Sequence, residues 1–100
     1  MADFKMYNQE LRDRNGRTVG KIYNNEIRDI NGRTVGKVYN DEIRDINGRA
    51  IVKIYNNEIR DTNGRRVATI GDAMKEIDGA NMLNPKLVVA LWIFFVKRGR

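Results

Sequence analysis

The sequence predicts an all-β fold with one helix: an antiparallel meander of about ten short strands, closed radially around a C-terminal apolar helix. Two observations lead to this prediction. A 16-residue unit with two turn signals recurs four times, and one short apolar segment follows it. We expect a single domain of 100 residues. It consists of four hairpin repeats over 4–70, a degenerate fifth hairpin and linker over 71–83, and a central hydrophobic helix over 84–97.

The repeated unit reads Tyr-Asn-x-Glu-Ile-Arg-Asp-x-Asn-Gly-Arg-x-Val-x-Lys-Ile. Asn-Gly is the strongest short hairpin signal, because both central residues of a type I′ turn need a positive φ. Asn24-Asn25 and its equivalents supply a second turn, since Asn tolerates the left-handed region. Two turns in 16 residues leave about six residues for each strand, a usual length. The repeat therefore predicts an antiparallel meander.

The register follows if both turns are two-residue loops. Ile22 then faces Ile27, Ile27 faces Gly36, and these residues share the apolar face of the sheet. That inner face has a layer of large residues and a layer of mostly small ones: Met6, Leu11, Ile22, Ile27, Val38, Ile43, Ile54, Ile59 and Ile70 in the first, and Phe4, Gly20, Gly36, Val52 and Ala68 in the second. Glycine within a strand often marks a close approach, so another segment is expected against the small layer.

The repeat decays after Ile70. Residues 71–74 occupy the position of the Tyr-Asn turn, and residues 75–78 resemble a degenerate second strand. We therefore expect a fifth hairpin here.

The C-terminal segment begins with Asn84-Pro85, an N-cap followed by proline at the first helical position. Ten apolar residues, 87–96, follow without a break. A helix that is apolar on all sides is buried or lies in a membrane, and a spanning helix needs about 20 such residues. We expect a helix threading the ring, with Trp92, Phe94 and Phe95 as core anchors. A β-strand is the alternative, since Val, Ile, Phe and Trp favour strands.

The Tyr-Asn-x-Glu-Ile and Asp-x-Asn-Gly-Arg units over residues 4–70, with the apolar tail, resemble the β-flower family of small bacterial repeat domains. This resemblance implies hairpins arranged radially around a hydrophobic helix, and it implies no function. The plan is also similar in architecture to Tubby C-terminal domains, a likeness that implies binding of anionic lipid.

Composition narrows the function classes. The net charge of +6 favours acidic partners. The chain has no Cys and no His, which removes the commonest zinc ligands, the usual general base and every Cys/His nucleophile pair. We expect a non-enzymatic protein without cofactor or metal. The lack of Cys and of an export signal predicts a cytoplasmic location, with peripheral contact at the membrane.

The candidate anion-binding residues follow the Asn-Gly turns at one end of the ring: Arg17, Arg33, Arg49 and Arg65. Arg14 and Arg66 lie nearby, and Lys97, Arg98 and Arg100 emerge at either end. Guanidinium groups bind phosphate through paired hydrogen bonds. The alternative is that these arginines are solvated and paired with neighbouring carboxylates: Asp13, Asp29, Asp45 and Asp61. The same aspartates are expected to accept turn amides rather than to bind calcium, because arginines surround them.

Two further sets of residues lie on the outer face. The glutamates at 10, 26, 42 and 58 are expected to pair across strands, as in Glu26–Lys37 and Glu42–Lys53, rather than to act as glycosidase carboxylates. The tyrosines at 7, 23, 39 and 55 are expected to cover outer aliphatic groups; alternatives are stacking on single-stranded nucleic acid and a membrane-interface belt. Val19, Val35, Ile30 and Ile46 would make this face a protein contact surface.

These observations favour a binding module for an anionic partner, above all a phospholipid surface, through the Arg-rich end. The alternative is a structural or protein-interaction repeat module. Nucleic acid is less favoured as a partner, and the sequence does not specify an oligomeric state.

Overall fold

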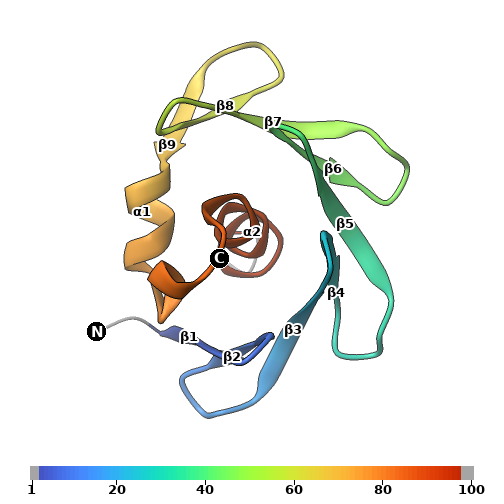
Figure 1. Cartoon of the computed structure of the whole chain (residues 1–100), viewed down its shortest axis with the longest axis vertical. Helices are drawn as coiled ribbons and strands as arrows, with labels where there is room; N and C mark the ends of the chain where they lie inside the picture. The colour runs from blue at the N-terminus through green and yellow to red at the C-terminus, as the bar shows by residue number, and fades with distance from the viewer. Residues whose placement is uncertain (1–2, 98–100) are drawn as a thin grey trace.

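A ring of short strands surrounds one helix (Figure 1). The computed structural model describes residues 3–97. Within them ten strands form one sheet: β1 (Phe4–Tyr7), β2 (Glu10–Asp13), β3 (Thr18–Tyr23), β4 (Glu26–Arg28), β5 (Thr34–Tyr39), β6 (Glu42–Asp45), β7 (Ala50–Tyr55), β8 (Glu58–Asp61), β9 (Arg66–Thr69) and β10 (Ile77–Asp78). The predicted radial meander is confirmed. The sheet itself stays open, since its order runs β10-β1 and on to β9 and no pairing joins β9 to β10.

The predicted register is confirmed at the strand centres. Ile22 pairs with Ile27, and Ile27 pairs with Gly36. Tyr23 pairs with Glu26 across a two-residue loop, in which Asn24 has a φ of 55°. A positive φ at the first loop residue alone is the sign pattern of a type II′ turn.

The Asn-Gly loops differ from the predicted two-residue type I′ turn. The amide of Asp29 donates to the carbonyl of Arg33 (2.9 Å), so three residues form the loop, and of these only Gly32 has a positive φ, 86°. This is the three-residue hairpin loop that ends in a left-handed glycine. The following bulge pairs Arg28 with Thr34 instead of Val35.

The bulge reverses one prediction about the outer face. Val19 and Val35 pack against the core and do not lie on the outer surface, because the extra residue in the strand shifts the alternation of side chains. Ile30 and Ile46 lie in the loops themselves and are exposed at 59% and 66%.

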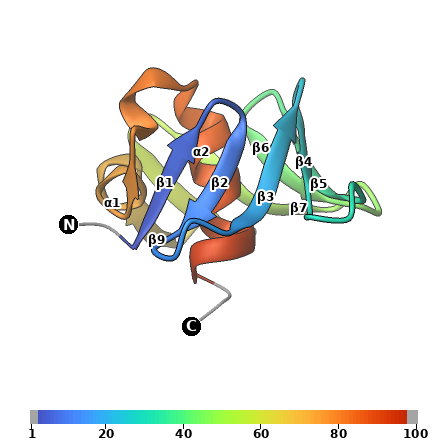
Figure 2. The ribbon, with the colours of Figure 1, turned by 90° about the horizontal axis from the view of Figure 1, so that it is seen from below.

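The C-terminal segment is helical and runs down the centre of the ring (Figures 1 and 2). It consists of α2 (Pro85–Leu91) and a π-helical continuation, η2 (Trp92–Lys97). The side chain of Asn84 caps α2 by accepting from the amide of Lys86 (2.9 Å). The strand alternative is wrong, since strands contact the segment on several sides and only a helix presents apolar side chains in all directions. Among residues 3–97, no helix is long and apolar enough to cross a membrane.

The small inner layer admits the two phenylalanines of η2. A Cβ atom added at Gly20 would overlap the ring of Phe95, and one added at Gly36 would overlap the ring of Phe94. The prediction that another segment approaches this layer closely is therefore confirmed. Trp92 is only 6% exposed, in agreement with its expected role in the core.

The predicted fifth hairpin is wrong. Residues 70–75 form a helix, α1 (Ile70–Lys75), and β10 pairs in parallel with β1. The cause lies in a capping box: the Thr69 hydroxyl accepts from the Asp72 amide (3.1 Å), and the Asp72 carboxylate accepts from the Thr69 amide (3.0 Å). Helix α1 lies between β9 and β10, where it covers the opening of the sheet (Figure 1). A short 3-10 turn, η1 (Ala80–Met82), leads on towards α2.

Candidate functional site

The Asn-Gly loops are built around the repeated aspartates. In the β4–β5 loop, the Asp29 carboxylate accepts from the amides of Asn31 (2.9 Å) and Arg33 (3.0 Å). The other three loops repeat this pair of hydrogen bonds: Asp13 with Asn15 and Arg17, Asp45 with Asn47 and Arg49, and Asp61 with Asn63 and Arg65. The expected turn-holding role of the aspartates is confirmed. Between residues 3 and 97, no group of three or more carboxylates is placed to hold a metal ion.

The candidate arginines stand at the ends of these loops. Arg17, Arg33, Arg49 and Arg65 are all exposed. Their backbone amides bind the aspartates, but within the described residues their guanidinium groups form no ion pair, so the Asp–Arg pairing of the alternative interpretation is wrong. The four loops point away from the axis on different sides of the ring (Figure 1), so the arginines do not converge on one point.

Other cations lie near this end. Arg14 approaches Asp3 (4.0 Å), and Arg66 approaches Glu58 (3.8 Å). The C-terminal part of η2 reaches the same end, since Phe95 and Val96 line a pocket there together with Asn15. Lys97 therefore emerges beside the Asn-Gly loops. Arg98 and Arg100 lie outside the described residues.

The outer wall carries a cluster that recurs in each repeat. In the second repeat, the Arg28 guanidinium lies 4.3 Å from the ring centroid of Tyr23 and 3.0 Å from the Glu26 carboxylate. The Thr34 hydroxyl donates to the same carboxylate oxygen (3.1 Å). The expected Glu–Lys pairs are opposite each other in the register, but each glutamate binds the arginine two residues along its own strand instead.

These hydrogen bonds act on the acidity of two glutamates. Arg28 and then Thr34 lower the pKa of Glu26, and Arg12 and then Thr18 lower the pKa of Glu10. The third repeat has Ala50 at the threonine position, and in the fourth Arg66 occupies it.

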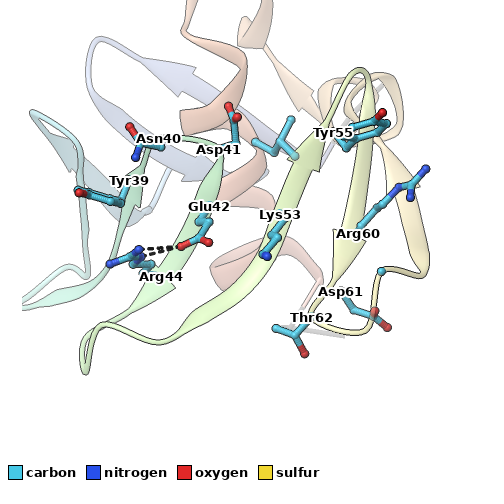
Figure 3. Close-up of a pocket in the computed structure, with 12 residues that line it drawn as sticks. Tyr39, Asn40, Asp41, Glu42, Arg44, Lys53, Tyr55, Arg60, Asp61 and Thr62 are labelled. Carbon is cyan, nitrogen blue, oxygen red and sulfur yellow. Dashed lines mark hydrogen bonds and ion pairs between the residues drawn. The ribbon is translucent and has the colours of Figure 1, made fainter.

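A trough crosses the outer face of β6, β7 and β8 (Figure 3). Tyr39, Glu42 and Arg44 line one side, and Tyr55 and Arg60 line the other. Lys53 lies between the two sides, with Asp61 and Thr62 at the end nearest the Asn-Gly loops. The volume of the trough is about 450 Å³.

The sequence that forms this ring and its central helix matches one known protein family. The sequence profile of a family described as 5-fold beta-flower protein matches residues 4–96. The chain belongs to the 5-fold β-flower family. The resemblance of the repeats is thereby confirmed, and membership makes this β-flower a repeat module whose family carries no assigned function.

In this β-flower, four hairpins with Asn-Gly loops occupy most of the ring, and α1 with β10 takes the remaining sector. No curated protein and no solved structure matches the chain. The architectural likeness to Tubby C-terminal domains therefore stays a prediction.

Sequence reasoning missed the Tyr–Arg stacks and the trough around Lys53. One signal for the stacks was present, since a residue diagonal to a cross-strand pair lies within reach of a long side chain. Tyr23 pairs with Glu26, and Arg28 is that diagonal neighbour. The trough had no such signal, because it depends on how three strands of the β-flower curve.

Proposed function

We propose that this β-flower is a non-enzymatic binding module that docks on anionic phospholipid surfaces through two neighbouring loop tips. The observation that carries the proposal is the make-up of the β4–β5 and β6–β7 loops. Each has an exposed isoleucine, Ile30 or Ile46, three residues before an arginine that forms no ion pair within residues 3–97, Arg33 or Arg49. An apolar side chain beside a free cation at a loop tip suits a surface with hydrocarbon beneath anionic headgroups.

The magnitudes suit reversible binding. Moving an isoleucine side chain out of water is worth roughly 1.5–3 kcal/mol, and a cation near an anionic leaflet about 1 kcal/mol. Two isoleucines and two arginines thus contribute on the order of 5–8 kcal/mol, which corresponds to roughly micromolar to submillimolar association. A free phosphate ion would use the arginines alone, so the exposed isoleucines favour a lipid surface.

A protein partner is the second candidate. It is favoured by a shallow apolar groove at the same end, lined by Ile51, Val52, Val67 and Ile93 with Lys97 at its edge. A partner that buries an apolar side chain there would use a surface next to, but distinct from, the two loop tips.

Vesicle co-sedimentation tests the proposal. Vesicles of phosphatidylserine and phosphatidylcholine should pull down the protein, and phosphatidylcholine alone should not. Both I30S/I46S and R33E/R49E should reduce the bound fraction at least fivefold, and added salt should weaken wild-type binding. The matched control is K21E/K37E, which makes the same charge change at exposed positions on β3 and β5.

Two results would contradict lipid docking. One is equal, low recovery of the wild-type protein with neutral and anionic vesicles. The other is a loss in K21E/K37E as large as that in R33E/R49E, which would show that net charge alone governs binding.

A further inference from the structure

The trough over β6–β8 lies on the outer wall, away from the two loop tips, and has its own chemistry (Figure 3). Most charges along it are already compensated. Arg44 pairs with Glu42 (2.8 Å) and Arg60 with Glu58 (2.6 Å). At one end Asp41 pairs with Lys86 (2.9 Å). At the other end, the Asp61 carboxylate accepts two backbone amides.

Lys53 is the cation of the trough that has no such partner. It is exposed, it lies opposite Glu42 and Arg60 in the register, and within the described residues it forms no ion pair. Figure 3 shows it between the two walls of the trough. Among the charged side chains that line the trough, Lys53 is thus the cation, and Asp61 the carboxylate, without an opposite side-chain partner within residues 3–97.

The walls combine aromatic surface with both kinds of hydrogen-bonding group. Tyr39 and Tyr55 are 52% and 60% exposed, although Arg44 and Arg60 lie over their rings at 4.2 and 4.9 Å. Carboxylates, the Asn40 amide and the Thr62 hydroxyl supply acceptors and donors along the trough. Aromatic surface next to mixed donors and acceptors suits a ligand with many hydroxyl groups and an apolar ring face.

We propose that this trough binds an acidic sugar, a uronate unit of an acidic oligosaccharide, with its carboxylate on Lys53 and its hydroxyl groups on the polar side chains of the walls. The carboxylate of one sugar unit matches the ammonium group of Lys53. This site is independent of the lipid-docking loops.

The preceding repeat has a related but less polar surface. Lys37 occupies the position of Lys53, while Asn25 replaces Asp41 and Ile46 replaces Thr62. Asn25 still offers hydrogen-bonding groups, so the side chain that is lost around Lys37 is the hydroxyl of Thr62, in whose place Ile46 is apolar. This difference supplies a control within the same molecule, since K37M removes an equivalent charge from the less suitable surface.

Titration calorimetry with trigalacturonate tests the site. The wild-type protein should bind it, K53M should weaken binding about tenfold, and T62I should weaken it to a smaller extent. K37M should retain wild-type affinity. Unfolding temperatures of the variants, measured in parallel, should stay unchanged because these side chains are exposed.

Triglutamate with blocked ends carries the same three carboxylates without sugar rings. It should bind at least tenfold more weakly than trigalacturonate. Equal or tighter binding of this peptide would overturn the sugar assignment. Absence of binding to trigalacturonate, or equal losses in K53M and K37M, would overturn the site itself. Vesicle binding by K53M stays unaffected if the two surfaces are separate.

Discussion

The guanidinium group of Arg28 lies 4.3 Å from the ring centroid of Tyr23 and binds the carboxylate of Glu26 at the same time. The other repeats place Arg12 over Tyr7, Arg44 over Tyr39 and Arg60 over Tyr55 in the same way. Each turn of the meander thus stabilises its own outer surface, and the repeated Tyr, Glu and Arg positions need no ligand to explain them.

The stack predicts that lysine cannot replace Arg28. R28K keeps the charge but loses the planar group that covers the ring, so we expect a loss of about 0.5–1 kcal/mol in the free energy of unfolding. In a domain of this size the unfolding temperature should fall by roughly 2–8 °C. Thermal unfolding by circular dichroism measures this. R14K, at an exposed position with only a 4.0 Å approach to Asp3, should stay at the wild-type temperature. Equal melting of R28K and R14K would mean that the stack contributes nothing.

The small inner layer predicts a severe effect at Gly36. G36A places a methyl group in the ring of Phe94 and 2.6 Å from the backbone carbonyl oxygen of Arg44, and overpacking of this kind costs roughly 1–3 kcal/mol. Denaturant unfolding should show the loss, and adding G36A should cost less in an F94A background than in the wild type, because the ring that the methyl group overlaps is then absent. G71A is the matched control, since Gly71 lies in α1 with its nearest neighbour atom at 3.7 Å. That change should be neutral or stabilising by up to about 1 kcal/mol. A stable G36A protein would contradict the close packing of η2.

The free energy of unfolding should decrease in acid, because protonation of the outer-wall glutamates removes their ion pairs. The pKa values of Glu10 and Glu26 are lowered in the folded protein by bonds from Arg12 and Arg28. A lowered folded-state pKa stabilises the protein above the unfolded value, and this contribution disappears as pH falls through the folded value. The loss therefore begins near the ordinary value of 4.5 and continues below it. Unfolding temperatures measured from pH 7 to pH 2.5 should fall less steeply in E10Q/E26Q than in the wild type. Identical slopes would show that other groups govern acid unfolding.

The single tryptophan reports on the central helix. Trp92 is nearly buried, and its indole nitrogen donates to the carboxylate of Glu76 (3.2 Å). Its emission should be blue-shifted in aqueous buffer and protected from iodide, and both properties should disappear on unfolding. Emission like that of free indole in the folded protein would contradict a helix inside the ring.

Much of this fold follows from local signals. The 16-residue period, the pairing of Ile22 with Ile27 and the helix after Asn84 each depend on residues near one another in the chain. A turn brings its two flanking strands together, and alternation then assigns every side chain to a face. The loop arginines could be placed for the same reason, because each directly follows an Asn-Gly pair.

Other features required the tertiary structure. The bulge after Ile27 turned Val35 inward, and the salt bridges of the glutamates went to arginines rather than to the opposing lysines. The trough around Lys53 arises from the curvature of three strands, which no single turn determines.

The 16-residue repeat, its turn signals and the apolar C-terminal segment by themselves determined that this chain forms a ring of hairpins with an apolar helix inside. Only the tertiary structure decided how that ring ends: β10 joins β1 in parallel, and α1 covers the opening beside β9. The physical reason is distance along the chain. Hairpin contacts join neighbours through turns, whereas Phe4 meets Ile77 only after the intervening strands have curved around the helix.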